Sequence, residues 1–331
     1  MRVFGKWLGR VILALAVVGA GAWMFGPYEP VEVGVSFDER KFGEGVGVYL
    51  ESVEAAFDDI TPGVEKRVIW AGEREAKTPV AVLYVHGFSA TSEELRPVPD
   101  RVAEAYGANL VFTRIRGHGR PGEAMGPPRV KDWMEDVAEA LAVARAVGDE
   151  VIVIATSTGC TLVAEALLQP DNAKGVKAVA FVSPNFAIHD SKSWILTLPG
   201  ARWFVPLLVG RERSWEPADE ATRTYWTTRY PIQAVITLAA LAKHAAAQDY
   251  SGVSVPTLFY YSGADQVVDA RVTDRIAAEW GRKGGVPATV VPLPDDAKVV
   301  ENRHVIAGWI ASPGNTDAAT KVMLDWLKGV M

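Results

Sequence analysis

Short apolar segments recur along this chain and alternate with longer segments in which apolar residues repeat at helical spacing. The short segments are rich in β-branched residues, which is typical of buried strands. We predict strands at 67–70, 80–85, 110–115, 151–154, 176–182, 257–261 and 289–293. We predict helices at 93–106, 131–147, 158–168, 270–280 and 316–328. This alternation predicts an α/β fold with a mostly parallel central sheet and helices on both faces.

A long insertion interrupts the alternation after the strand at 176–182. About 70 residues separate Asn185 from Ser254, which is too many for a simple connecting loop. They include four tryptophans and a helical stretch at 232–247. We call residues 185–253 the insertion and expect it to be mainly helical.

The first 28 residues have the pattern of a targeting or anchoring segment. Basic residues precede an uncharged stretch of 18 residues, Val11 to Tyr28, which is near the lower limit for a membrane-spanning helix. The basic residues are Arg2, Lys6 and Arg10. Because the basic end of such a segment stays in the cytoplasm, the remaining chain is expected outside it, membrane-anchored or exported.

Three interpretations of residues 1–28 stay open. The short apolar core and the small residues Ala20-Gly21-Ala22 resemble a secretory signal with its cleavage site. Trp23, Phe25 and Tyr28 favour a retained anchor instead, because aromatic side chains gather at membrane interfaces. The third interpretation is a buried amphipathic helix of a cytosolic protein.

Residues 29–63 fit the alternation poorly. They are rich in glycine and acidic residues, so we expect a linker or arm that is extended or forms a short helix. Residues 64–331 are predicted to form one domain that includes the insertion.

A candidate nucleophile lies at the end of one predicted strand. Residues 151–160 are predicted to form a buried strand that turns sharply into a helix at Ser157. A nucleophile elbow needs small residues two positions before and after the serine, where strand and helix backbones converge. Ala155 and Gly159 occupy these positions, although the usual pattern has glycine at both. The same local pattern also fits a serine that caps a helix after an ordinary strand.

Polar turns follow three other predicted strands. His86-Gly87-Phe88 follows the strand at 80–85, and Asp265 comes just after the strand at 257–261. His304 lies in a polar loop after the strand at 289–293. The order along the chain is therefore serine, acid, histidine, which is the order in α/β-hydrolases.

With these motifs the chain resembles the α/β-hydrolase superfamily, from about residue 64 to residue 331. The resemblance is to serine hydrolases of the monoacylglycerol lipase, lysophospholipase and carboxylesterase branch. The matching motifs are His86-Gly87-Phe88, Arg116-Gly117-His118-Gly119, the helix start at 132–137, the Ser157 elbow, the acid loop at 263–268 and His304. The resemblance implies that the insertion is a lid, and that the backbone N–H groups of Phe88 and Thr158 form an oxyanion hole.

Ser157 needs a base and an acid beside it to act as a nucleophile. Its hydroxyl is a poor nucleophile at neutral pH, so a base must remove the proton during attack. His304 is assigned this role because histidine titrates close to neutral pH. Asp265 would accept a hydrogen bond from the other ring nitrogen and fix the tautomer.

Other residues compete for these roles. Asp269 is the alternative acid, but its position predicts that it begins the next helix. His86 and His118 are expected to shape their glycine-flanked turns, and His189 and His244, in the insertion, are expected to be surface or lining residues without a carboxylate partner. Cys160, the only cysteine, is expected to be a small packed side chain.

Composition narrows the remaining possibilities. A single cysteine permits no intrachain disulfide, and a net charge of −6 gives no footprint for nucleic acid. The sequence has no zinc-ligand spacing and no glycine-rich nucleotide loop, so no metal or other cofactor is expected. The oligomeric state is left open.

The favoured function is therefore a metal-independent serine esterase. The apolar insertion favours a small hydrophobic ester of a lipid-like acyl group, cleaved through an acyl-enzyme on Ser157. A proline-releasing peptidase or a thioesterase would use the same residues. A haloalkane dehalogenase is disfavoured, because its nucleophile would be aspartate. A noncatalytic membrane-tethered binding protein is the alternative from another class.

Overall fold

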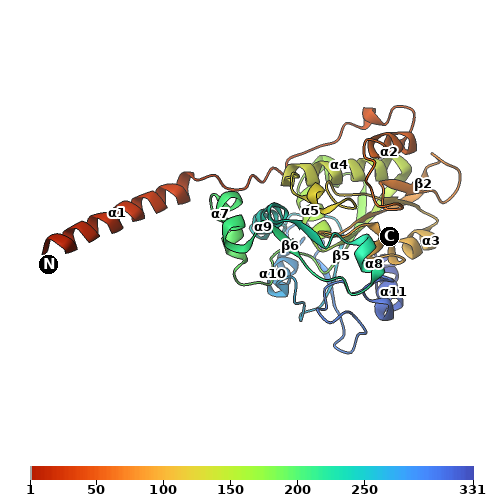
Figure 1. The fold of residues 1–331 in the computed structure, drawn as a ribbon. Coiled ribbons are helices and arrows are strands. Elements are labelled where there is room, and N and C mark those ends of the chain that lie inside the picture. The colour runs from red at the N-terminus through yellow and green to blue at the C-terminus, as the bar shows by residue number, and fades with distance from the viewer. Residues whose placement is uncertain (1) are drawn as a thin grey trace.

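A seven-stranded sheet forms the centre of the molecule, as the computed structural model of residues 2–331 shows (Figure 1). The strand order is β1-β3-β2-β4-β5-β8-β9. The strands are β1 Arg67–Ile69, β2 Thr78–Val85, β3 Asn109–Phe112, β4 Gly148–Thr156, β5 Val176–Val182, β8 Thr257–Tyr261 and β9 Thr289–Pro292. Only β1 pairs antiparallel, with β3, so the predicted mostly parallel sheet is confirmed.

Helices cover both faces of this sheet, and the two faces form separate apolar clusters. The helices of the domain are α2 Val46–Glu54, α3 Val98–Tyr106, α4 Val130–Val147, α5 Thr158–Leu167, α6 Pro170–Ala173, α10 Ala270–Glu279 and α11 Thr316–Leu327. Leu83 and Val153 point to the face covered by α4, α5 and α10. Their neighbours Tyr84 and Ile154 point to the face covered by α3 and α11. This alternation follows from the two-residue repeat of a strand.

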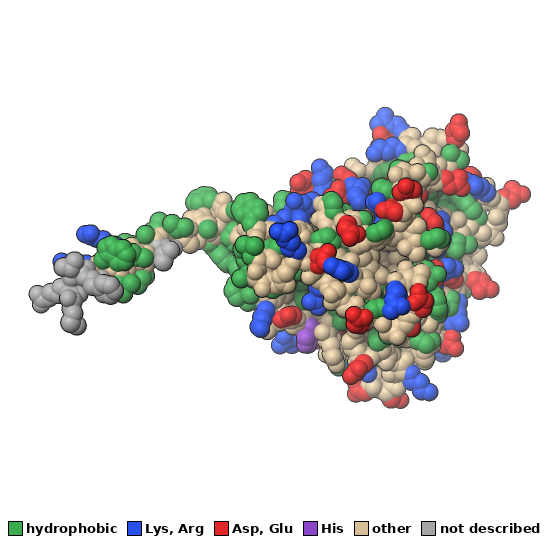
Figure 2. Space-filling model, in the orientation of Figure 1, with side chains coloured by type: hydrophobic (Ala, Val, Ile, Leu, Met, Phe, Trp, Pro, Cys, Tyr) green, Lys and Arg blue, Asp and Glu red, His purple; other side chains and the backbone are tan. Residues whose placement is uncertain are grey.

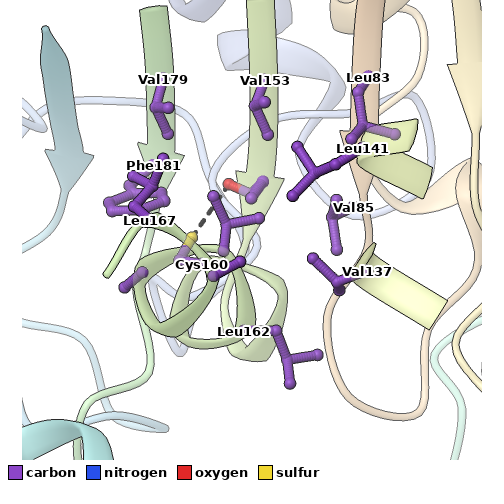
Figure 3. Packing of buried hydrophobic residues seen from close by; sticks show 14 of the residues in the cluster. Leu83, Val85, Val137, Leu141, Val153, Cys160, Leu162, Leu167, Val179 and Phe181 are labelled. Atoms are coloured by element: carbon purple, nitrogen blue, oxygen red, sulfur yellow. Dashed lines mark hydrogen bonds between the residues drawn. The ribbon is translucent and has the colours of Figure 1, made fainter. Parts of the chain in front are cut away.

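Cys160 lies inside the first of these clusters, between α5 and the sheet. Figure 3 shows its side chain among Val153, Val179 and Phe181. Its Sγ donates a hydrogen bond of 3.1 Å to the carbonyl oxygen of Ala155. Burial raises the pKa of the Cys160 thiol well above its ordinary value. The prediction of a small packed side chain is therefore confirmed, and burial makes the thiol a weak nucleophile.

One predicted helix begins later than expected. The stretch predicted at 93–106 begins with a 3-10 turn at Ser92–Glu94, and α3 starts only at Val98. Pro97 is the reason, because a residue before proline is disfavoured in helical conformation. Pro99 fits the first turn of α3, where its missing N–H costs nothing.

The N-terminal helix α1, Arg2–Phe25, stands away from the domain (Figure 1). Within it, Lys6–Phe25 is long and apolar enough to cross a membrane, with mean hydropathy 1.9 and none of the span buried. The chain then runs extended to a 3-10 turn at Glu39–Phe42 and to α2. Val46 and Leu50 of α2 pack into the cluster beneath α4. The division of the chain at residue 63 stays a prediction.

The insertion contains helices and one small sheet. Its elements are a 3-10 turn at Ser193–Thr197, α7 Ala201–Val209, β6 Glu212–Ser214, α8 Glu220–Tyr225, β7 Arg229–Pro231 and α9 Ile232–Ala246. Strands β6 and β7 pair antiparallel, an element that the sequence did not predict. Helix α9 packs against α5, so the insertion lies next to the helix that follows Ser157.

Candidate active site

Ser157 occupies a sharp turn between β4 and α5. Its backbone has φ 52° and ψ −117°, a conformation that is strained for any residue except glycine. A Cβ at Gly159 would lie 2.3 Å from the carbonyl oxygen of Val85, so only glycine fits there. Ala155 is buried in the sheet, where its single methyl group packs in the core. The local sequence therefore produces the geometry of a nucleophile elbow.

The Ser157 hydroxyl lies at one end of a chain of hydrogen bonds. Ser157 Oγ is 2.9 Å from His304 Nε2, and His304 Nδ1 is 2.7 Å from Asp265 Oδ2. The exposed fractions of Ser157, Asp265 and His304 are 6%, 3% and 7%. Since a carboxylate only accepts hydrogen bonds, His304 donates from Nδ1 and presents Nε2 to the serine as an acceptor. This orientation allows the ring to take a proton from the hydroxyl.

The two candidate acids occupy different environments. The second carboxylate oxygen of Asp265 accepts hydrogen bonds from the N–H groups of Val267 and Val268, at 2.8 and 3.0 Å, which fix its orientation toward His304. Asp269 instead caps α10 and forms an ion pair of 2.7 Å with Arg271. The structure therefore brings Asp265 to the histidine and leaves Asp269 at the helix start.

The loop that carries His304 is held from several sides. Arg303 adopts φ 55°, and its guanidinium donates to the hydroxyl of Ser262 at 2.9 Å and to the carbonyl of Pro294 at 2.9 Å. The N–H of His304 donates to the Asn302 side chain at 3.1 Å. These contacts fix the loop relative to the end of β8, where the acid loop begins.

The His86-Gly87-Phe88 turn lies directly against the elbow. A Cβ at Gly87 would lie 3.1 Å from the Cβ of Ser157, so glycine permits this close approach. Within residues 2–331, the backbone N–H groups of Phe88 and Thr158 have no hydrogen-bond partner. Both groups are thus available to a ligand oxygen, as an oxyanion hole requires.

His86 and His118 lie behind this turn. His86 Nδ1 is 2.8 Å from the Gly87 carbonyl, and its Nε2 accepts the N–H of Ile115 at 3.1 Å. Burial lowers the pKa of His86 to about 4, so the ring is neutral. The ring of His118 packs against that of His86, with centroids 5.2 Å apart. Neither ring bonds to Ser157, and both brace the turns.

The two histidines of the insertion lie away from Ser157. His189 is exposed. His244 Nε2 lies 3.7 Å from the Glu165 carboxylate, a neighbour on α5 that the sequence did not indicate. The expectation that His244 has no carboxylate nearby was wrong, because α9 folds back onto α5 from far along the chain.

A buried carboxyl group that the sequence analysis missed lies beneath the same turn. Glu94 Oε2 accepts hydrogen bonds from the Gly87 N–H at 2.7 Å and from the Tyr84 hydroxyl at 3.0 Å. Tyr84 also bonds to Thr156, the residue before the serine. Burial raises the pKa of Glu94 to about 7. The sequence placed Glu94 in the exposed first turn of a helix, where an acid is ordinary.

We expect Glu94→Gln to flatten the pH dependence of stability. Unfolded glutamate releases its proton near pH 4.5, whereas folded Glu94 does so near pH 7. The folded state therefore binds more protons between these values, so the wild-type free energy of unfolding should fall as pH rises through this window, by on the order of 3 kcal/mol. Glutamine keeps an acceptor for Gly87 and does not titrate. Urea unfolding at pH 5 and pH 8 measures both proteins.

Glu93→Gln is the matched control for this change, because Glu93 lies next to Glu94 and forms a partly buried ion pair with Arg96. It should keep the wild-type pH dependence. An equal loss of stability between pH 5 and pH 8 in wild type and Glu94→Gln would contradict the assignment.

The insertion contacts the turn that lies beside Ser157. The Phe88 ring packs edge-on against Tyr230 of β7, with centroids 5.3 Å apart. Two surface cavities, of about 340 and 360 Å³, lie along the insertion, and neither is lined by Ser157 or His304. Within residues 2–331, no cluster of three or more His, Cys, Asp or Glu side chains could hold a metal.

The chain is similar to a known protein family and to a characterised lipase. Residues 76–286 match the family model described as serine aminopeptidase, S33. A thermostable monoacylglycerol lipase of Bacillus sp. (strain H-257) is 39% identical over 61 residues. That match covers 18% of this chain and 24% of the lipase, so it spans about a quarter of the relative's length.

Solved structures show the same fold over most of the chain. The monoacylglycerol lipase of Paleococcus ferrophilus superimposes with a TM-score of 0.57 at 16% identity, covering 81% of this chain and 100% of that one. A soluble variant of monoglyceride lipase from Saccharomyces cerevisiae, in complex with a substrate analogue, gives 0.59 at 13% identity, covering 81% and 91%. These similarities establish the fold.

Proposed function

This chain belongs to the serine aminopeptidase S33 family of α/β-hydrolases, and on that premise we propose that it is a serine hydrolase for carboxylic esters of hydrophobic acyl groups. The observation that carries the proposal is the chain of hydrogen bonds from Ser157 through His304 to Asp265. Gly87 and Gly159 permit close contacts around the serine that a larger residue would prevent. The backbone N–H groups of Phe88 and Thr158, which have no hydrogen-bond partner within residues 2–331, also support nucleophilic catalysis by Ser157.

The reaction begins when Ser157 Oγ attacks the ester carbonyl carbon while His304 Nε2 takes the hydroxyl proton. The negative oxygen of the tetrahedral intermediate accepts hydrogen bonds from the N–H groups of Phe88 and Thr158. His304 then gives its proton to the departing alcohol, which leaves an acyl group on Ser157. Water attacks this acyl-enzyme with His304 again as the base, and the acid is released.

The insertion acts as a lid over this site. Tyr230 of the insertion contacts Phe88 of the oxyanion turn, and Ser157 beside this turn is only 6% exposed. Lipase names among the relatives and the apolar composition of the insertion support a lipid-like substrate. Opening of the lid would expose apolar side chains to water. A hydrophobic acyl chain that binds against these side chains covers them again, so such a substrate favours the open state.

We place the protein at a membrane through α1. The apolar span at Lys6–Phe25 is unburied, and its two basic residues, Lys6 and Arg10, lie in its N-terminal part. The positive-inside rule puts this basic end in the cytoplasm and the catalytic domain outside it. The domain thereby faces lipid substrates on the outer surface of that membrane.

Turnover of p-nitrophenyl esters of graded chain length tests the proposed function. We expect hydrolysis that prefers medium or long acyl chains over acetate, because a buried apolar site gains about 0.8 kcal/mol per buried methylene. Proline arylamides and acyl thioesters belong in the same panel. Preferred cleavage of the arylamide would show that the protein is a peptidase rather than an esterase. No turnover of any substrate would favour a binding protein.

A further inference from the structure

Helix α7 of the insertion is apolar on both of its faces. Its inner face, with Ala201 and Val205, packs against Ile232 and Ile236 of α9. Four other apolar residues of α7 are exposed: Trp203 on the opposite side of the helix, and Leu207, Leu208 and Val209 around its C-terminal end, at 71%, 82%, 69% and 64%. We call these four residues the α7 face. Figure 2 shows apolar side chains gathered there, beside the base of α1. A soluble surface rarely exposes such a contiguous apolar patch without a partner.

The start of α7 is attached to the chain that leaves α1. The N–H of Gly200 donates to the carbonyl of Pro27 at 2.8 Å. A Cβ at Gly26 would lie 2.5 Å from the Cβ of Pro199, so glycine is needed for this contact. The α7 face therefore lies next to the point where the apolar helix ends.

A buried ionic cluster fixes this arrangement. The Glu29 side chain is only 3% exposed and binds Arg202 of α7 at 2.6 Å and Arg129 before α4 at 2.8 Å. Thr237 of α9 donates to the same carboxylate at 3.2 Å. One carboxylate thus joins the chain after α1, helix α7 and the domain. These bonds hold the chain that follows α1 next to α7.

We propose that the α7 face docks into the surface of the lipid bilayer that α1 spans. Helix α7 runs across the direction of α1 and lies on the side of the domain from which α1 projects (Figure 1). If α1 crosses the bilayer, α7 therefore lies at the bilayer surface, where Trp203 and the apolar C-terminal end of the helix can enter the lipid. This inference rests on the membrane location in the proposed function.

The surroundings of the α7 face fit a lipid surface better than a second protein. Lys192 and Arg211 are exposed on either side of α7 in the sequence and can meet lipid phosphates. Trp23 and Trp194 lie at the same junction and line the cavity of about 340 Å³ together with Leu198. Tryptophan at the level of the headgroups is typical of membrane-facing helices. The docked helix belongs to the insertion, so docking directs the lid toward membrane-embedded substrate.

Site-specific fluorescence in the full chain tests the docking. Leu207→Cys carries an environment-sensitive probe, while Cys160 is buried and stays unlabelled. The full chain is reconstituted into phosphatidylcholine vesicles with a fraction of phosphatidylglycerol, with and without brominated lipid. We expect brominated lipid to quench the probe at 207 and to leave a probe at Lys321→Cys on α11, an exposed control, unchanged.

A third probe at Val17→Cys, in the middle of α1, distinguishes failure of the docking from failure of the membrane location. Quenching at 17 but not at 207 would overturn the docking and leave the membrane location intact. Quenching at neither site would overturn both. A concentration-dependent change at 207 that brominated lipid does not affect would indicate a second copy of the chain, and would also overturn the proposal.

A functional measurement accompanies the probes. The double variant Leu207→Glu, Leu208→Glu should hydrolyse a long-chain monoacylglycerol in vesicles at least tenfold more slowly than wild type. Hydrolysis of a soluble short-chain ester should stay within twofold. Equal loss on both substrates would point to damage of the site and contradict docking.

Discussion

Replacing Ser157 with alanine should lower kcat for any ester by about 10⁶-fold, because no other group near His304 can form the acyl-enzyme. The folded state should change little, since the variant loses one hydrogen bond that contributes about 1 kcal/mol. A fluorophosphonate probe, which labels activated serines, should label wild type and leave Ser157→Ala unlabelled. Thermal unfolding checks that the variant is folded.

Ser183→Ala is a matched control for this experiment. Ser183 is also a buried serine with positive φ at the end of a strand, but its hydroxyl has no hydrogen-bond partner within residues 2–331. Ser183→Ala should keep wild-type labelling and turnover. Full labelling of Ser157→Ala would show that another residue is the nucleophile, and would remove the basis of the proposed function.

Asp265→Asn should lower kcat by about 10⁴-fold at neutral pH. Its amide oxygen can still accept from Val267 and Val268, so the loop should keep its shape. The amide nitrogen would then face His304 Nδ1 as a donor. The ring would accept there and carry its proton on Nε2, the tautomer that cannot take a proton from Ser157. Steady-state kinetics over a range of pH measures the loss.

The control for the acid is Asp269→Asn, four residues along the same loop. Asp269 caps α10 and pairs with Arg271, so its amide variant should lose some stability and keep kcat within a few-fold. Asp265→Asn with activity within tenfold of wild type would mean that orientation of His304 does not depend on this carboxylate.

Much of the architecture could be predicted from local patterns. The strand at 151–154 and the helix after it were predicted from β-branched residues and helical spacing, and the structure has β4 and α5 there. Errors arose at element ends, where neighbouring residues compete. Pro97 delays α3, and β3 ends at Phe112 instead of Ile115, whose N–H donates to His86 rather than to a neighbouring strand.

The candidate site was predictable to the extent that each residue follows its own strand. Parallel strands end at one edge of a sheet, so the turn at Ser157, the loop at Asp265 and the loop at His304 had to lie near one another. Glu94 was not predictable in this way. Its burial depends on a turn that carries it back under Gly87, and the sequence near it has the composition of an exposed helix start.

The sequence by itself determined the order of strands and helices, the sharp turn at Ser157 and the apolar character of α1, because these depend on residues a few positions apart. Tertiary structure alone decided which carboxyl group is buried beneath the His86-Gly87-Phe88 turn, and that the α7 face lies beside α1. These features depend on contacts between residues far apart in the chain. Local patterns fix which face of an element is apolar, but only the assembled fold fixes what that face meets.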